Sequence, residues 1–202
     1  KLSKMKQPDL ENFVGIHNRK YCDGGQCIRL YKTFMKKKDP EAANIVMGHN
    51  EEDLLGLGTI FSLLAYKKLY DGEYHPKQCV ILEQELKIVI ELSAAAPVNV
   101  SCGNSDFYLS VNGYEARMLV HLKEGKLRQY YRNYKDYEFI PGEDTAMPKS
   151  ITRYMDKSLK IATTPQTCYT WFNCDEDFLN NEKKQMQYLT HTLPFFLDNL
   201  NK

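Results

Sequence analysis

The chain has 202 residues, of which 43% are hydrophobic and 26% charged, as in a folded protein with one large or two small domains. Its formal net charge of +1 excludes a strong overall attraction to phosphate, so a nucleic-acid partner would need a local basic patch. No apolar run approaches the roughly 20 residues that span a bilayer, and no apolar segment follows the basic residues 1–6, which excludes a secretory signal there.

Six cysteines are spread along the chain, and the two closest pairs, Cys22/Cys27 and Cys168/Cys174, have four and five residues between their members. Structural zinc sites usually contain tighter Cys-x-x-Cys pairs, and a chain of this length can bury a sufficient core without disulfides. The spacing therefore favours reduced, mostly buried thiols over a zinc site, and it predicts a reducing cytoplasm as the location.

The first third of the chain reads as helical. Apolar residues have helical spacing over residues 27–35, after a predicted turn at residues 23–25, and again from Ala42 to about residue 70. The segment 39–41, Asp-Pro-Glu, predicts the start of the second helix, because it supplies an N-cap, a proline in the first turn and an acid beside it. Gly56 and Gly58 predict either a bend in this helix or close packing against it.

From residue 78 onward the pattern changes to short apolar and alternating segments, which favour strands. Asn112-Gly113 predicts a hairpin turn between two of them. The expected fold is α+β, with a helical part at residues 1–70 and a mainly antiparallel, β-rich region with a C-terminal helix at residues 71–202. The expected strands are 80–82, 86–92, 107–111, 116–122, 129–131 and 167–172, and the expected helices are 150–159 and 182–200.

The segment 48–57 contains the clearest candidate site. On a helix, His49 and Asp53 lie four residues apart on one face, close enough to share a ligand. The same spacing also suits an ordinary surface ion pair, with Glu51 and Glu52 as exposed acids on a solvated helix.

The segment 48–57 resembles the third motif of the DEDD exonucleases, in which a Tyr or His precedes the last metal-binding Asp on a helix. The spacing is that of the tyrosine subclass, although the residue here is His49. The wider sequence resembles the YprB-type RNase H-like proteins of Firmicutes, which are bacterial. The similar segments follow one order along nearly the whole chain: 13–16, 23–25, 28–31, 49–57, 133–137, 141–146, 149–150 and 168–170.

This resemblance implies a 3′–5′ exonuclease that hydrolyses phosphodiesters in single-stranded DNA or RNA with two divalent cations, Mg²⁺ or Mn²⁺. Asp53 would be a metal ligand, and His49 would orient or deprotonate the attacking water. Residues 1–70 would be the C-terminal helical part of the RNase H-like domain, and residues 71–202 an accessory domain.

The chain departs from this family pattern at its start. The first motif, an Asp-x-Glu on a strand, and the second-motif Asp should precede residues 23–25, and neither is found there. Residues 83–85 and 175–177 have similar letters but follow the third motif, and we interpret them as a strand edge and a solvated loop. With an initial residue other than Met, the sequence is interpreted as the trimmed C-terminal part of a larger enzyme, inactive by itself. The alternatives are a non-catalytic nucleic-acid-binding module from a degenerate RNase H-like protein, or a protein-binding scaffold domain.

A second candidate surface combines basic and aromatic residues, the combination that a single-stranded nucleic acid needs for its phosphates and bases. The alternative is a tyrosine-rich strand half buried in a sheet. Downstream, Glu143-Asp144 predicts a turn held by carboxylate hydrogen bonds, and Trp171 is expected in the core. The candidate nucleic-acid-binding residues are Lys126, Arg128, Tyr130, Arg132, Tyr134 and Lys135.

Overall fold

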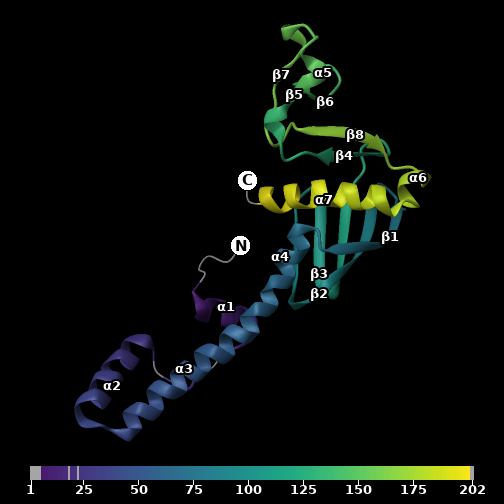
Figure 1. Ribbon diagram of the computed structural model, residues 1–202. Coiled ribbons are helices and arrows are strands. Elements are labelled where there is room, and N and C mark those ends of the chain that lie inside the picture. The colour runs from purple at the N-terminus through teal and green to yellow at the C-terminus, as the bar shows by residue number, and fades with distance from the viewer. Residues whose placement is uncertain (1–5, 18, 22, 201–202) are drawn as a thin grey trace. The chain divides into compact units, whose positions relative to one another are not determined.

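The computed structural model describes residues 6–17, 19–21 and 23–200. The chain divides into two compact units, residues 1–64 (unit 1) and residues 65–202 (unit 2) (Figure 1). Unit 1 is helical, whereas unit 2 combines helices with antiparallel sheets, so the chain is a mixture of helix and antiparallel sheet as the sequence predicts. In the part of the chain that the structure describes, no helix is both long and apolar enough to cross a membrane.

Unit 1 contains α1 (Gln7–Phe13), α2 (Gly24–Lys37) and α3 (Pro40–Ile60). Asp39 caps α3 by accepting a hydrogen bond from the Glu41 amide at 3.0 Å, which confirms the predicted start. The expected turn at residues 23–25 is instead the beginning of α2, because the Asp23 side chain caps it. The single helix expected up to residue 70 is interrupted by the 3₁₀ turn η1 (Phe61–Leu63) before α4 (Leu64–Asp71) begins.

The largest sheet of unit 2 is antiparallel, in the order β1 (Tyr74–Leu82), β2 (Glu85–Gly103) and β3 (Phe107–His121). The hairpin expected at Asn112-Gly113 is wrong, since β3 runs through it and pairs with β2 on both sides. Buried residues occupy odd positions before this point and even positions after it, and the pairing with β2 is irregular over the same stretch. Gly113 takes the positive φ of 55° that this irregularity needs.

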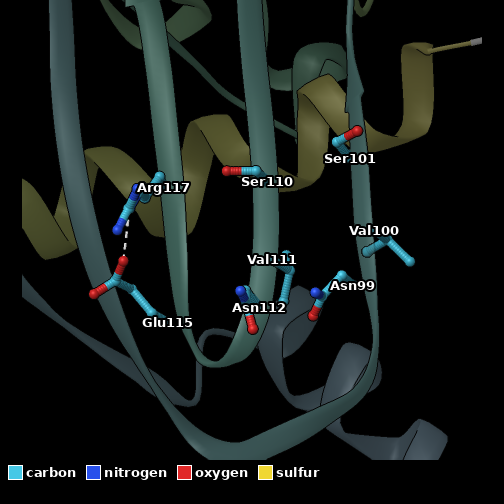
Figure 2. A pocket seen from close by; sticks show the side chains of 8 residues that line it. All are labelled: Asn99, Val100, Ser101, Ser110, Val111, Asn112, Glu115 and Arg117. Carbon is cyan, nitrogen blue, oxygen red and sulfur yellow. Dashed lines mark hydrogen bonds and ion pairs between the residues drawn. The ribbon is translucent and has the colours of Figure 1, made fainter.

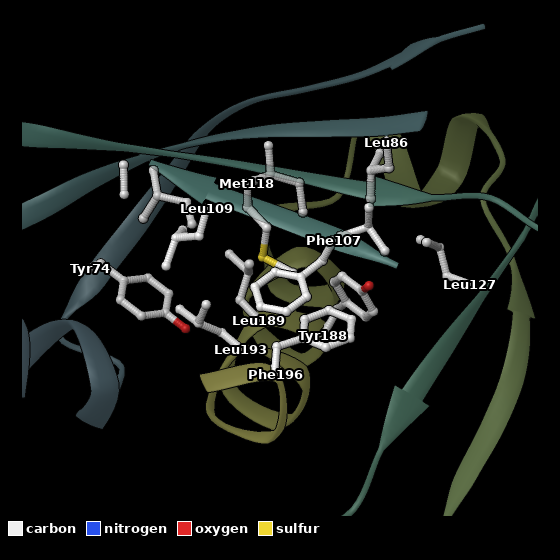
Figure 3. Packing of buried hydrophobic residues seen from close by; sticks show 14 of the residues in the cluster. Tyr74, Leu86, Phe107, Leu109, Met118, Leu127, Tyr188, Leu189, Leu193 and Phe196 are labelled. Atoms are coloured by element: carbon white, nitrogen blue, oxygen red, sulfur yellow. The ribbon is translucent and has the colours of Figure 1, made fainter. Parts of the chain in front are cut away.

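The core of unit 2 lies between this sheet and the helix α7 (Glu182–Asn199), which crosses the strands (Figures 1 and 3). The rings of Phe107 from β3 and Phe196 from α7 stack with their centroids 4.2 Å apart. Strand side chains such as Leu86 and Met118 are fully buried beside Tyr188 and Leu189 of α7 (Figure 3). Burial of this apolar surface is the main stabilising contribution to the unit.

The rest of unit 2 is made of short strands and helical turns. The strand β4 (Lys126–Tyr130) pairs antiparallel with β8 (Tyr169–Asn173), and a separate sheet has the order β6-β5-β7. The helix expected at 150–159 is wrong, because this range contains only the end of α5 and one 3₁₀ turn. The remaining elements are η2 (Tyr134–Asp136), β5 (Tyr137–Ile140), β6 (Thr145–Pro148), α5 (Lys149–Thr152), η3 (Lys157–Leu159), β7 (Ile161–Ala162) and α6 (Glu176–Leu179).

The two acidic segments outside the candidate site have structural positions. Glu83, with a φ of 54°, lies in the turn between β1 and β2. Residues 175–177 are exposed, as expected, but they begin α6 rather than a loop, and the Asp175 side chain caps this helix by accepting from the Phe178 amide at 3.0 Å. Neither segment therefore supplies the missing family motif.

Cys79, Cys102, Cys168 and Cys174 are reduced thiols in the structure, and Cys22 lies outside the described residues. Burial raises the pKa of Cys79 to about 12 and the pKa values of Cys168 and Cys174 to about 11. Such thiols stay protonated at neutral pH and are poor metal ligands. No cluster of three or more His, Cys, Asp or Glu residues that could hold a metal ion occurs within the described ranges.

Candidate functional site

His49 and Asp53 lie side by side on α3, as their spacing predicts. The Nε2 atom of His49 is 3.4 Å from Oδ2 of Asp53. His49 is 9% exposed, whereas the Asp53 side chain is 36% exposed, so the carboxylate is the part of the pair that solvent or a ligand can reach. The other ring nitrogen of His49, Nδ1, is buried and has no hydrogen-bond partner among the described residues.

Arg19 joins Asp53 to a second acid, Glu11, that the sequence did not suggest. Its Nη1 donates to Oδ1 of Asp53 at 2.5 Å, while Nε and Nη2 donate to the two Glu11 oxygens at 2.8 and 2.7 Å. Gln7 completes this carboxylate network by donating from Nε2 to Glu11 Oε1 and to the backbone oxygen of Asp53, both at 2.9 Å. The helix α1 and the segment around Arg19 are thereby fastened to α3.

Charge pairing stabilises the carboxylate network in its ionised form. Hydrogen bonding from Arg19 lowers the pKa of Glu11, although burial of that carboxyl acts in the opposite direction. The same hydrogen bond to Glu11, supported by Asp53, raises the pKa of Arg19 further above its ordinary value. Glu11 is only 2% exposed, so its charge is compensated almost entirely by Arg19.

Replacing Glu11 by glutamine is expected to destabilise unit 1 by about 1–3 kcal/mol, because Arg19 loses a charged partner in a poorly solvated place. A carboxyl with a lowered pKa contributes stability above its ordinary value of 4.5 and loses it as the pH falls through the lower folded value. The variant should therefore lose stability at pH 7 and show a weaker acid dependence. Amide hydrogen exchange of α3 between pH 3 and pH 7 measures both effects. Equal protection of α3 in the two proteins at pH 7 would contradict this role of Glu11.

Two glycines of α3 allow the neighbouring segments to approach closely. A Cβ atom on Gly56 would overlap Glu11 Oε1 and come within 3.3 Å of Gln7 Nε2, and one on Gly48 would overlap the Tyr21 ring. Glu52, between them, accepts hydrogen bonds from the amides of Lys20 and Tyr21 at 2.8 and 3.2 Å. The sequence predicts either a bend or close packing at Gly56, and the close packing is confirmed. Gly58 has open space around it.

The described residues of this site do not fit a divalent metal ion. Magnesium and manganese need several oxygen ligands at once. Asp53 contacts Arg19 through one oxygen and His49 through the other, and both oxygens of Glu11 accept from Arg19. A metal at Asp53 would require further carboxylates and the release of Arg19, whose positive charge repels a cation.

α3 and the first residue of η1 carry a row of exposed apolar side chains. Met47, Leu54 and Phe61, spaced by seven residues, are 69%, 71% and 66% exposed, and Leu55 is 67% exposed. Seven residues are close to two helical turns, so the first three lie on one side of the helix axis. A contiguous apolar face of this kind marks a surface that packs against another element.

The basic and aromatic candidates of unit 2 do not form one row. The Tyr130 ring is in the core, stacked on Phe195 with 3.6 Å between ring centroids, so it offers no face to a base. The Arg128 guanidinium lies 4.6 Å from the ring centroids of both Tyr169 and Trp171. Lys126, at the start of β4, is exposed.

Arg132 and Tyr134 follow the end of β4 and line a different hollow from the one that contains Arg128. This hollow has a volume of about 370 Å³ and is also lined by Tyr70 and Tyr131. The Arg132 guanidinium lies 4.9 Å from the Tyr70 ring centroid. Lys135 is exposed on η2. A cation and several tyrosines at one place are compatible with base stacking.

The turn at Glu143-Asp144 is held by carboxylate hydrogen bonds, as expected. Asp144, at a φ of 50°, accepts from the Tyr169 hydroxyl at 2.6 Å and from Trp171 Nε1 at 3.1 Å. Burial, followed by the hydrogen bond to Asp144, raises the pKa of Tyr169 to about 12. Trp171 is half-buried and lines two hollows, so its predicted place entirely in the core is only partly right.

A further hollow lies on β2 and β3 and has a volume of about 530 Å³ (Figure 2). Its lining is mostly Asn, Ser and Val. Its two charged residues, Glu115 and Arg117, pair with each other at 2.6 Å (Figure 2). Because this pair compensates its own charge, the hollow offers no unbalanced group to a charged ligand.

Residues 1–65 match RNase_H_2, a family model of the RNase H superfamily. The match covers less than half of the chain and includes Glu11, Arg19, His49 and Asp53. No curated protein and no solved structure matches the chain. The match supports an RNase H-like, nuclease-like domain, of a superfamily that generally binds nucleic acids and typically uses divalent metal ions.

Proposed function

We propose that residues 1–70 are the C-terminal helical part of a YprB-type RNase H-like 3′–5′ exonuclease domain and that residues 71–202 are its accessory domain. The substrate is single-stranded DNA or RNA, in the cytoplasm of a bacterium of the Firmicutes. The observation that carries this proposal is the His49–Asp53 pair, 3.4 Å apart and partly open to solvent, within the segment that matches the RNase H superfamily.

In this proposal His49 orients or deprotonates the attacking water, and Asp53 orients the imidazole ring of His49. Asp53 would hold Mg²⁺ or Mn²⁺ only if further carboxylates joined it and its contact with Arg19 were released. The resemblance implies that these carboxylates belong to the first and second family motifs, which are not found before residues 23–25. The described residues are therefore proposed to be inactive by themselves.

The exposed apolar face of α3 supports a larger domain around it. Met47, Leu54 and Phe61 would each remain two-thirds exposed if unit 1 packed against nothing else. Full burial of each such side chain contributes about 1.5–3 kcal/mol, which is a strong drive toward a packing partner. We propose that the remaining part of the RNase H-like domain covers this face.

A non-catalytic nucleic-acid-binding module is the second candidate function. It is favoured by the contact between Arg19 and Asp53, which neutralises the carboxylate that a metal would need. Lys126, Arg132, Tyr134 and Lys135, which are exposed or half-buried, would supply the contacts to phosphates and bases in such a module.

The two candidates differ in the products that they leave. The complete protein is incubated with Mn²⁺ or Mg²⁺ and with single strands of DNA and of RNA, labelled at the 5′ end or at the 3′ end. The exonuclease proposal predicts a ladder of progressively shorter 5′-labelled products and immediate release of the label from 3′-labelled strands. It also predicts that a chelator abolishes both. Binding without cleavage under every condition would favour the module.

A further inference from the structure

A hollow in unit 2, separate from the site on α3, combines positive charge with aromatic walls. It has a volume of about 270 Å³ and lies where the ends of β3, β4 and β8 meet α7. This volume is near the lower end of the range of about 300–1,000 Å³ for sites of drug-sized ligands, so it suits a smaller molecule. The lining includes the charged, polar and aromatic residues Asp106, His121, Lys123, Arg128, Tyr130 and Trp171.

The Arg128 side chain is hydrogen-bonded to Tyr130, but one of its donors has no acceptor. Its Nε atom is fully shielded from solvent and has no hydrogen-bond partner among the described residues. Nor does any carboxylate in the described part of the chain lie within 4.0 Å of the guanidinium nitrogens. The rings of Tyr169 and Trp171 provide cation–π contacts at 4.6 Å, but these do not satisfy an N–H donor. The positive charge of Arg128 therefore has no ion-pair partner among the described residues, and this charge lines the hollow.

A second cation, Lys123, lies near the same Trp171 ring as Arg128. The Lys123 ammonium is 5.5 Å from the Trp171 ring centroid, and it has no ion-pair partner among the described residues. Lys123 also lines the adjoining hollow of about 340 Å³, which shares Trp171 with the first one. The two cations therefore lie near one ring, and among the described residues neither has a carboxylate within ion-pair distance.

The nearby acids do not neutralise these cations. Asp144 is engaged by the Tyr169 hydroxyl and the Trp171 indole. Asp106 lines the hollow but lies beyond ion-pair distance of both cations, so its carboxylate can accept from a hydroxyl of a ligand. His121, in the same lining, adds a further donor next to Lys123.

We infer that this hollow binds a mononucleotide through its phosphate monoester. Arg128 and Lys123 hold the phosphate oxygens, because a guanidinium fork and an ammonium are the groups that recognise phosphate. The exposed edge of Trp171 contacts the base, and Asp106 accepts from a sugar hydroxyl. The phosphate monoester can come from a free mononucleotide or from the phosphorylated end of a strand. The inference does not depend on exonuclease activity, since every residue in it belongs to unit 2.

Trp171 provides a direct readout, because it is the single tryptophan among the 202 residues. Its emission is followed while the 202-residue chain is titrated with adenosine 5′-monophosphate, adenosine, inorganic phosphate, and an oligonucleotide with or without a 5′-phosphate. Calorimetry measures the same affinities without optical interference from the base. The expected result is a saturable change in emission with the monophosphate and an affinity for adenosine at least tenfold weaker.

Variants separate the proposed contacts from general effects. Arg128→Gln is expected to weaken binding of the monophosphate by about 10–100-fold, which corresponds to the loss of a charge-assisted hydrogen bond. Lys123→Gln, at an exposed position, tests the second cation without disturbing the core and is expected to weaken binding about tenfold. Arg153→Gln is the matched control, since Arg153 also lies 4.6 Å from an aromatic ring, Tyr154, but lines none of these hollows.

Each outcome supports or overturns the inference. Tight binding of the 5′-phosphorylated oligonucleotide with weak binding of the free nucleotide would support the monoester and identify the strand end as its source. Equal binding of oligonucleotides with and without the phosphate would overturn it, because the hollow would then read the phosphodiester backbone. No saturable change with any of these probes, or equal affinity of Arg128→Gln and the unmodified protein, would also overturn it.

Discussion

Gly56→Ala is expected to destabilise unit 1 by about 1–3 kcal/mol, the usual effect of overpacking a filled interior. The added methyl group would overlap Glu11 Oε1 and press on the Gln7 amide. Glu11 cannot move away without cost, because both of its oxygens accept hydrogen bonds from Arg19. The substitution would therefore separate α1 from α3 and loosen Arg19, even though alanine is a better helix former than glycine.

Gly58→Ala is the matched control, two residues further along the same helix. Open space surrounds Gly58, so alanine there should increase the stability of α3 by up to about 1 kcal/mol. Amide hydrogen exchange of α1 and α3 distinguishes the two variants, with faster exchange in Gly56→Ala and slower exchange in Gly58→Ala. Similar exchange in both variants would contradict the close packing of Glu11 against Gly56.

Local signals in the sequence predicted the parts of the fold that local interactions decide. The start of α3 is set by the Asp39 side chain and by Pro40, which act on neighbouring amides and backbone angles. The same holds for the proximity of His49 and Asp53, because helix geometry alone brings residues four apart together. These features needed no knowledge of the rest of the chain.

Features that depend on distant partners were missed. Asn112-Gly113 is a hairpin signal, but β2 is long enough to pair with the strand on both sides of it. Glu11 and Arg19 gave no signal of a role, since their contacts to Asp53 arise only when α1 packs on α3. The sequence predicts Tyr130 as a residue that binds nucleic acid, whereas its ring is stacked on Phe195 of α7. The strand β4 ends at Tyr130, so Arg132 and Lys135 do not lie on this strand.

Asp53→Asn is expected to reduce nuclease activity of the complete protein by on the order of 100-fold or more, the usual effect of removing a charged group from a catalytic site. Asparagine keeps an oxygen that can accept from Arg19 Nη1, so the contact between α3 and Arg19 is largely preserved. Activity should thus fall much more than stability. Glu51→Gln is the control, because it removes a negative charge from an exposed position on the same helix.

The cleavage rate of a 5′-labelled single strand by the unmodified protein, Asp53→Asn and Glu51→Gln, in Mn²⁺, tests the central proposal most directly. The account predicts shortening ladders for the unmodified protein and Glu51→Gln and none for Asp53→Asn, with similar hydrogen-exchange protection of α3 in all three. Undiminished cleavage by Asp53→Asn would contradict it, and Asp53 would then be only a counter-ion of Arg19. No cleavage by the unmodified protein would contradict it as well and favour the nucleic-acid-binding module.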